Sequence, residues 1–203
     1  MPNRGDRGGA QTRARIADVA TGLFIQHGFE EVTIADVAAA AGVSKVTVFH
    51  YFERKEDLLL DRLPDAVDIA RSAVRDRAPG TGVVTAMRHA AVRLAEQRHP
   101  LSGLAENAEP VMRTFTTSPA LIARLRAFEH EIESALADEL RADAVFTGDS
   151  DLAATLLVAA YRHVAVETVR QRLAGGELDE VARDHQARIT AAFSAVEHGI
   201  PDG

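Results

Sequence analysis

Three hydrogen-bonding side chains follow a short glycine-containing turn in the N-terminal part of the sequence. Lys45, Thr47 and His50 fall on the predicted outer face of a helix over residues 45–52, directly after the turn at 41–44. A lysine can donate to guanine O6 or N7, and a threonine can hydrogen-bond to a base or contact a thymine methyl group. These residues therefore have the chemistry of a helix that reads base edges in DNA.

A second predicted helix comes before the turn and must hold the reading helix in place. Thr33 can cap it, with Asp36 at the third position of a capping box. Gly42 supplies the positive φ of the turn, and Ser44 can cap the helix that follows. Two short helices joined by such a turn form a helix-turn-helix, whose second helix enters the major groove. Ala38, four residues before Gly42, is small enough to let the helices approach closely.

Further residues of the N-terminal part can position the DNA backbone. Lys45 and Lys55 are the only lysines, and Arg4, Arg7, Arg13 and Arg15 cluster near the N-terminus. A local basic surface can bind phosphate in an acidic chain, because charges more than about 8 Å apart are largely screened. The candidate DNA-contacting residues are Arg13, Thr33, Ser44, Lys45, Thr47, Val48, Phe49, His50, Tyr51 and Lys55.

The stretch over residues 12–60, about a quarter of the chain, resembles the DNA-binding domain of the tetracycline-repressor (TetR) family. Its most specific part is residues 33–58, TIADVAAAAGVSKVTVFHYFERKEDL. The resemblance implies an all-α homodimer with a three-helix DNA-binding domain and a larger helical domain that binds an effector and dimerises. Family members are mostly repressors that a small molecule releases from their operators.

Two positions depart from the usual pattern of the family. Phe49 stands where the family usually has Tyr, so it lacks a hydroxyl that would contact phosphate. Tyr51 stands where the family usually has His, and its hydroxyl could supply such a contact instead.

The composition excludes several other classes of function. The 46% hydrophobic and 26% charged residues are ordinary for a soluble globular protein, which we expect in the cytoplasm. The absence of Cys excludes disulfides, thiolate metal sites and a cysteine nucleophile. No phosphate-binding loop, Gly-x-Ser-x-Gly or His-Glu-x-x-His motif is present, so we expect no enzyme, cofactor or metal. A signal peptide is not expected, because no apolar h-region follows Met1. A membrane span is not expected either, because the apolar stretch 152–166 is shorter than about 18 residues and contains polar residues.

The chain divides into three predicted parts. Residues 1–11 are Gly-rich and predict a flexible arm, residues 12–63 form the helix-turn-helix domain, and residues 64–203 form the ligand-binding and dimerisation domain. The boundary falls at Pro64, which lacks an N–H and so kinks or restarts a helix. The net charge of −7 lies mostly after residue 57. Helices are expected over residues 12–26, 65–77, 81–97, 101–107, 111–115, 119–141, 149–173 and 178–198.

The last two predicted helices have the pattern of a subunit interface. The helix over 149–173 is apolar almost all round, and the helix over 178–198 is apolar on one side. Pairing with the same helices of a second copy would make a four-helix interface, so we expect a homodimer. His163, inside the more apolar helix, is expected either to be buried or to hydrogen-bond to a ligand.

An effector pocket between the helices of the C-terminal domain would be lined mostly by apolar side chains. Methionines and phenylalanines around one cavity suit a largely apolar ligand. A DNA-binding protein that is controlled by a protein partner, without a small-molecule effector, is the alternative. The candidate ligand-binding residues are Met87, Ala91, Leu94, Met112, Phe115, Phe128, Leu157 and Tyr161.

Overall fold

The computed structural model describes residues 4–199 and divides the chain into two compact units. The N-terminal unit comprises residues up to 61 together with residues 110–124. The C-terminal unit comprises residues 62–109 and the chain from residue 125 onward. The described residues form helices and loops without a strand, which confirms the predicted all-α class.

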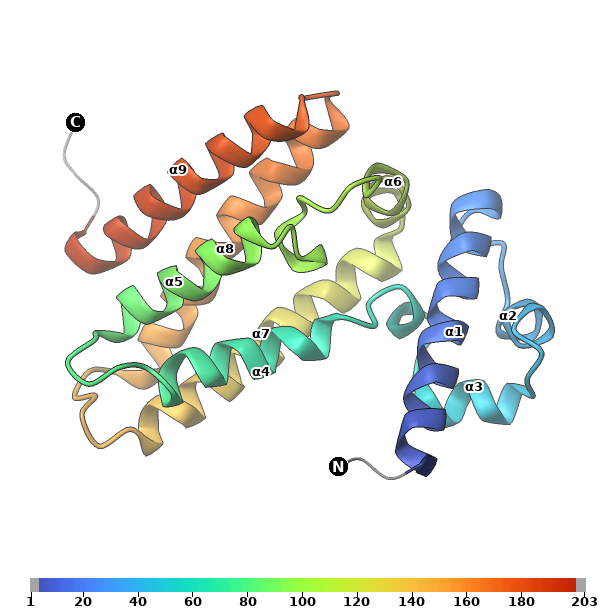
Figure 1. Ribbon diagram of the computed structural model, residues 1–203, viewed down its shortest axis with the longest axis horizontal. Coiled ribbons are helices and arrows are strands. Elements are labelled where there is room, and N and C mark those ends of the chain that lie inside the picture. The colour runs from blue at the N-terminus through green and yellow to red at the C-terminus, as the bar shows by residue number, and fades with distance from the viewer. Residues whose placement is uncertain (1–3, 200–203) are drawn as a thin grey trace. The chain divides into compact units, whose positions relative to one another are not determined.

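Three helices build the helix-turn-helix of the N-terminal unit: α1 (Arg4–His27), α2 (Ile34–Ala40) and α3 (Lys45–Tyr51) (Figure 1). Thr33 caps α2 in a capping box with Asp36, and the Ser44 side chain accepts from the backbone N–H of Thr47 at the start of α3. Gly42 has φ +66° in the turn between them, as the sequence predicts. The helices close a core that includes Ile16, Ala20, Phe24, Val37, Val48 and Phe52.

A segment distant in sequence completes this unit. Residues 110–124 span most of α6 (Glu109–Thr117) and the start of α7 (Pro119–Ala142). Leu121 is fully buried in the same core. The Ser118 hydroxyl donates to Glu30 Oε1 at 2.8 Å, and Arg124 Nε donates to Asp57 Oδ1 at 2.7 Å. The sequence predicts that residues 110–124 belong to the C-terminal domain, whereas their packing joins them to the helix-turn-helix.

The start of the chain and the region around Pro64 differ from expectation. α1 begins at Arg4, so residues 4–11 are helical and not part of a flexible arm, and residues 1–3 lie outside the described residues. The 3₁₀ turn η1 (Glu56–Leu58) lies between α3 and the next helix. Pro64 is the second residue of α4 (Leu63–Arg75), where its missing N–H breaks no helical hydrogen bond, so it starts a helix.

The C-terminal unit is a bundle of helices. α8 (Ser150–Leu173) and α9 (Leu178–His198) form an antiparallel hairpin, α9 also packs on α5 (Val83–Glu96), and α5 packs on α4 (Figure 1). Residues 125–142 of α7 complete the bundle. Its core includes Leu136, Leu140, Leu157, Val164, Ile189 and Phe193.

The helix expected over residues 101–107 does not form. The 3₁₀ turn η2 (Pro100–Ser102) is followed by Gly103 with φ +73° and later by Asn107 with φ +55°. Right-handed helices of L-residues exclude positive φ, so these two residues interrupt the helix.

The helix α8 is apolar on an exposed side as well as in the core. Leu152, Leu156 and Val166 are exposed, and so is His163, whose predicted burial is wrong. We expected this region to be too short and too mixed to cross a membrane, yet α8 has the length and composition of a span. Core helices of soluble proteins can have the same length and apolar composition, so one such helix is weak evidence for a membrane span.

A buried polar pair joins α8 to α9. His185 is fully buried, and its Nδ1 lies 2.7 Å from Thr168 Oγ1. Because the Thr168 hydroxyl donates to the Val164 carbonyl at 2.9 Å, the Nδ1–H of His185 donates to Thr168. Burial, with a smaller effect from the Arg188 cation, lowers the pKa of His185 to about 4. The imidazole is therefore neutral at pH 7.

Candidate nucleic-acid interface

The exposed face of α3 carries both polar and apolar side chains. Lys45 and His50 are exposed, as the sequence predicts for a reading helix. Val46 is 78% exposed and Phe49 is 54% exposed. Val46 was not among the sequence candidates, although helical periodicity could have found it, because it lies three residues before Phe49 on the same face.

Two of the predicted contact residues, Thr33 and Ser44, also cap helices. Ser44 Oγ accepts from Thr47 N at 3.0 Å, and the two hydroxyl oxygens lie 2.9 Å apart. Thr33 donates through its N–H and its hydroxyl to the Asp36 carboxylate, at 2.8 and 2.6 Å. These two bonds hold the pKa of Asp36 below its ordinary value, so its carboxylate is ionised and accepts both hydrogens at neutral pH.

Two candidates on α3 face the protein. Val48 is fully buried in the core of the N-terminal unit, so its assignment as a DNA-contacting residue is corrected: it anchors α3. Tyr51 is half-buried and packs against the same core, with its ring centroid 5.0 Å from that of His50.

Two predicted cationic contacts are engaged within the N-terminal unit. Arg13 donates to the Asp61 carbonyl at 3.2 Å, and its guanidinium carbon lies 4.9 Å from the centroid of the Phe52 ring. Lys55 Nζ lies 4.3 Å from the centroid of the Phe29 ring. Both cations therefore stabilise the helix-turn-helix through contacts with aromatic faces.

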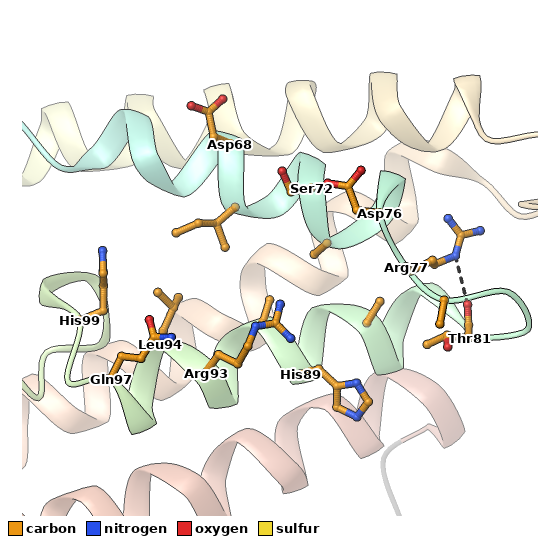
Figure 2. Close-up of a pocket in the computed structure, with 15 residues that line it drawn as sticks. Asp68, Ser72, Asp76, Arg77, Thr81, His89, Arg93, Leu94, Gln97 and His99 are labelled. Carbon is orange, nitrogen blue, oxygen red and sulfur yellow. Dashed lines mark hydrogen bonds between the residues drawn. The ribbon is translucent and has the colours of Figure 1, made fainter. Parts of the chain in front are cut away.

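A cavity of about 750 Å³ lies between α4 and α5 in the C-terminal unit (Figure 2). Small side chains and two larger aliphatic ones line part of it, while charged and polar groups line the rest. Arg77 Nε donates to the Thr81 carbonyl at 3.0 Å at one end, and Arg77 also pairs with Asp143. The apolar lining is Ile69, Ala73, Ala78, Ala86, Ala90 and Leu94, and the polar lining is Asp68, Ser72, Asp76, Arg77, Thr81, His89, Arg93, Gln97 and His99.

The predicted effector residues are not gathered around this cavity. Leu94 lines it, whereas the other seven do not. The Tyr161 hydroxyl donates to the Leu101 carbonyl at 3.2 Å, and burial raises the pKa of Tyr161 so that it stays protonated. Met87, Ala91, Leu157 and Tyr161 belong to the core of the C-terminal unit, Phe128 is buried in that unit, and Met112 and Phe115 belong to the N-terminal unit.

Comparisons with known proteins converge on the helix-turn-helix. Residues 16–61 match the family described as bacterial regulatory proteins, tetR family. The HTH-type transcriptional repressor KstR2 of Rhodococcus jostii (strain RHA1) is 32% identical over 56 residues, which are 28% of each chain. The HTH-type transcriptional regulator BetI of Agrobacterium fabrum (strain C58) is 38% identical over 63 residues, 30% of this chain and 31% of that protein. The matched part thus spans less than a third of either relative.

Solved structures share the fold along nearly the whole chain. A TetR-family regulator from Streptomyces coelicolor A3 has a TM-score of 0.57 at 20% identity, covering 96% of this chain and 98% of that one. SmeT in its triclosan complex has a TM-score of 0.61 at 19% identity, covering 91% of each chain. The capped helix-turn-helix and the match over residues 16–61 therefore identify a DNA-binding domain similar to that of the tetR family of bacterial regulatory proteins, and the solved structures share the all-helical fold of the rest of the chain.

Proposed function

We propose that this protein is a cytoplasmic transcriptional regulator that binds a double-stranded DNA operator through α3. The observation that carries the proposal is the exposed face of α3, presented by a capped turn within the residues that match the family. A helix of this kind fits the major groove, where each base pair presents a distinct pattern of donors and acceptors.

The proposal gives the two parts of the chain different roles. Residues 12–63 bind DNA, with Lys45, Phe49 and His50 at the bases. In this proposal Thr33 and Lys55 contact phosphates, whereas Tyr51 packs against the core of the N-terminal unit. The C-terminal unit binds an effector and forms the homodimer, and effector binding releases the protein from the operator, which makes it a repressor.

Fluorescence anisotropy tests the DNA-binding proposal directly. The protein is titrated against duplexes that tile the DNA upstream of its own gene, at two salt concentrations. We expect sub-micromolar affinity for one duplex, because specific affinities typically reach about 10⁻⁸–10⁻¹¹ M, and weaker binding at higher salt. Lys45→Ala should weaken binding to that duplex by about tenfold, since a direct base contact contributes about 1–3 kcal/mol.

The matched control is Arg126→Ala, which removes one exposed positive charge from α7 in the C-terminal unit. It should bind the preferred duplex as the wild type does. Equal binding to every duplex, with Lys45→Ala and Arg126→Ala indistinguishable, would refute sequence-specific reading by α3.

The cavity between α4 and α5 supports a small-molecule effector. Its volume of about 750 Å³ lies within the range of small-molecule sites, about 300–1,000 Å³. The apolar lining suits a ligand with an apolar body, and the surrounding charged groups suit polar substituents at its edges. SmeT, a structural neighbour, is known in complex with triclosan. We therefore place the effector in this cavity in preference to the residues predicted from the sequence.

A blocked cavity separates this proposal from control by a protein partner. Ser72 is half-buried on the lining, so Ser72→Trp would fill the space, and Ser134→Trp on the exposed side of α7 is the matched control. Compounds that release the wild type from its preferred duplex should still release Ser134→Trp but not Ser72→Trp. Equal release of both variants would place the effector elsewhere. Release by a protein but by no compound would favour the alternative.

A further inference from the structure

We infer that Val46 and Phe49 read the 5-methyl groups of thymines, so that each operator half-site carries thymines under α3. The inference rests on the proposed function and specifies what the same surface recognises. Val46 and Phe49 would thus select bases together with the hydrogen-bonding side chains of α3.

The pair stands out by its exposure. Val46 is 78% exposed and Phe49 is 54% exposed, on a helix of only seven residues. Residues three apart on a helix are neighbours on one face, so the two side chains form one apolar patch. An exposed apolar cluster on a short helix costs solvation free energy and marks a surface that is covered in the functional complex.

The surroundings of the patch indicate what covers it. Lys45 and His50 are exposed on the same helix, beside the apolar pair. Thymine is the base that presents a methyl group in the major groove, and its O4 acceptor lies on the same edge. An apolar side chain beside a lysine donor matches that edge, whereas the guanine edge presents acceptors alone.

Helix geometry restricts where the thymines lie. The Cβ atoms of residues three apart are about 5–6 Å apart, and successive bases of one strand are about 3.4 Å apart along the axis. The two side chains therefore reach methyl groups that are one or two base steps apart, on either strand. Phe49 has no hydroxyl, so its ring is available for the methyl group and not committed to a phosphate.

Replacement of thymine by deoxyuridine tests the inference, because it removes only the methyl group. The duplex is one recovered by the wild-type protein through selection from random-sequence DNA. Each thymine of a half-site is replaced singly, and affinities are measured by anisotropy for the wild type, Val46→Ala and Phe49→Ala. Alanine favours the helix, so both variants should keep α3, which circular dichroism verifies.

We expect one or two positions at which deoxyuridine weakens wild-type binding about fourfold, the value for one methyl group removed from an apolar contact. At the position that Val46 contacts, Val46→Ala should bind the two duplexes equally, and Phe49→Ala should do so at the other. Val145→Ala is the matched control, since Val145 is 80% exposed and lies outside α3. It should respond to deoxyuridine as the wild type does.

Three results would overturn the inference while the regulator function stands. In the first, deoxyuridine weakens binding at no thymine position. In the second, it weakens binding equally in all four proteins, which would indicate that the methyl group acts through DNA shape. In the third, Val46→Ala and Phe49→Ala bind the selected duplex as tightly as the wild type, which assigns the patch to a protein partner. Failure to select any duplex would instead refute the proposed function, and this inference with it.

Discussion

At the scale of single residues, His185 shows how burial changes the chemistry of a side chain. Its imidazole has no exposed surface, and Thr168 satisfies its Nδ1–H. Within the described residues its Nε2 has no hydrogen-bond partner. A proton on Nε2 would place a positive charge in the interior beside the Arg188 cation, which explains the lowered pKa of His185, about 4.

The lowered pKa predicts that acid destabilises the protein. Between pH 6.5 and pH 4 the unfolded chain binds a proton at His185 that the native state does not bind. The free energy of unfolding should therefore fall as the pH falls through this range, by about 3 kcal/mol from this group. Urea denaturation at pH 7.5, 6, 5 and 4 measures the fall.

A comparison of variants isolates the contribution of His185. His185→Asn retains a nitrogen donor near the Nδ1 position but cannot titrate, so its stability should depend less on pH between 6.5 and 4. His130→Asn removes an exposed histidine of α7 and should follow the wild type. A pH dependence that His185→Asn leaves unchanged would show that other groups cause the loss.

Residue types alone could predict the chemistry of the site, but not which residues are available for it. Lys45, Lys55 and Arg13 are equally good phosphate donors in the sequence. Lys55 and Arg13 are engaged by aromatic rings and by carbonyls that are 25 and 48 residues away in the chain. Such partners are fixed by tertiary packing, so the sequence could not separate them from Lys45.

At the scale of elements, α3 is too short to be stable alone. Isolated helices shorter than about 12–15 residues are marginal in water, and α3 has seven residues. It therefore depends on Val48 in the core and on Ser44 at its start. The Ser44 side chain accepts the otherwise unpaired backbone N–H of Thr47.

Loss of this cap should be measurable as a loss of stability. Ser44→Ala removes the acceptor and should lower the free energy of unfolding by about 1 kcal/mol. Ser44→Asn restores an oxygen acceptor and should regain most of the loss. Urea denaturation monitored by circular dichroism gives both values.

The control for the cap is Ser134→Ala, which changes an exposed serine inside α7. It should leave the stability unchanged or slightly raised, because alanine favours helix interiors. A Ser44→Ala protein as stable as the wild type would show that the cap contributes nothing to α3.

Most helices could be predicted because the residues that start, end and pattern them lie close together in the sequence. The caps at Thr33 and Ser44, the turn at Gly42 and the apolar periodicity of α8 and α9 each lie within a few residues. The start of α1 and the segment 110–124 could not be predicted in the same way. That segment joins the N-terminal unit through buried Leu121, the Arg124–Asp57 ion pair and the Ser118–Glu30 hydrogen bond, whose partners are far away in the chain.

At the scale of the whole molecule, the exposed side of α8 carries an argument for two copies. Leu152, Leu156 and Val166 recur at helical spacing and are exposed at 56%, 43% and 43%. The adjacent helix α9 exposes the small side chains of Ala187 and Ala191, which allow close approach. A second copy that pairs the same helices would cover this surface and form a four-helix interface.

The proposed dimer predicts that one charge on α8 abolishes both dimerisation and operator binding. Leu156→Glu would place two carboxylates in a self-complementary apolar interface, so it should sediment as a monomer where the wild type sediments as a dimer. A dimer binds two half-sites about 34–36 Å apart, so the monomer should lose most affinity for the full operator while α3 is unaltered. Sedimentation velocity and anisotropy measure the two effects.

Val145→Glu is the control, since Val145 is 80% exposed and lies outside α8. It should remain dimeric and bind DNA as the wild type does. Dimeric Leu156→Glu would exclude this face as the interface. Monomeric Leu156→Glu with undiminished operator affinity would instead show that each N-terminal unit binds alone. Leu156 lies in α8, which shares no residue with the DNA-reading helix α3. The loss of both dimerisation and operator affinity in Leu156→Glu would therefore show that the exposed side of α8 pairs the two copies that bind the two half-sites.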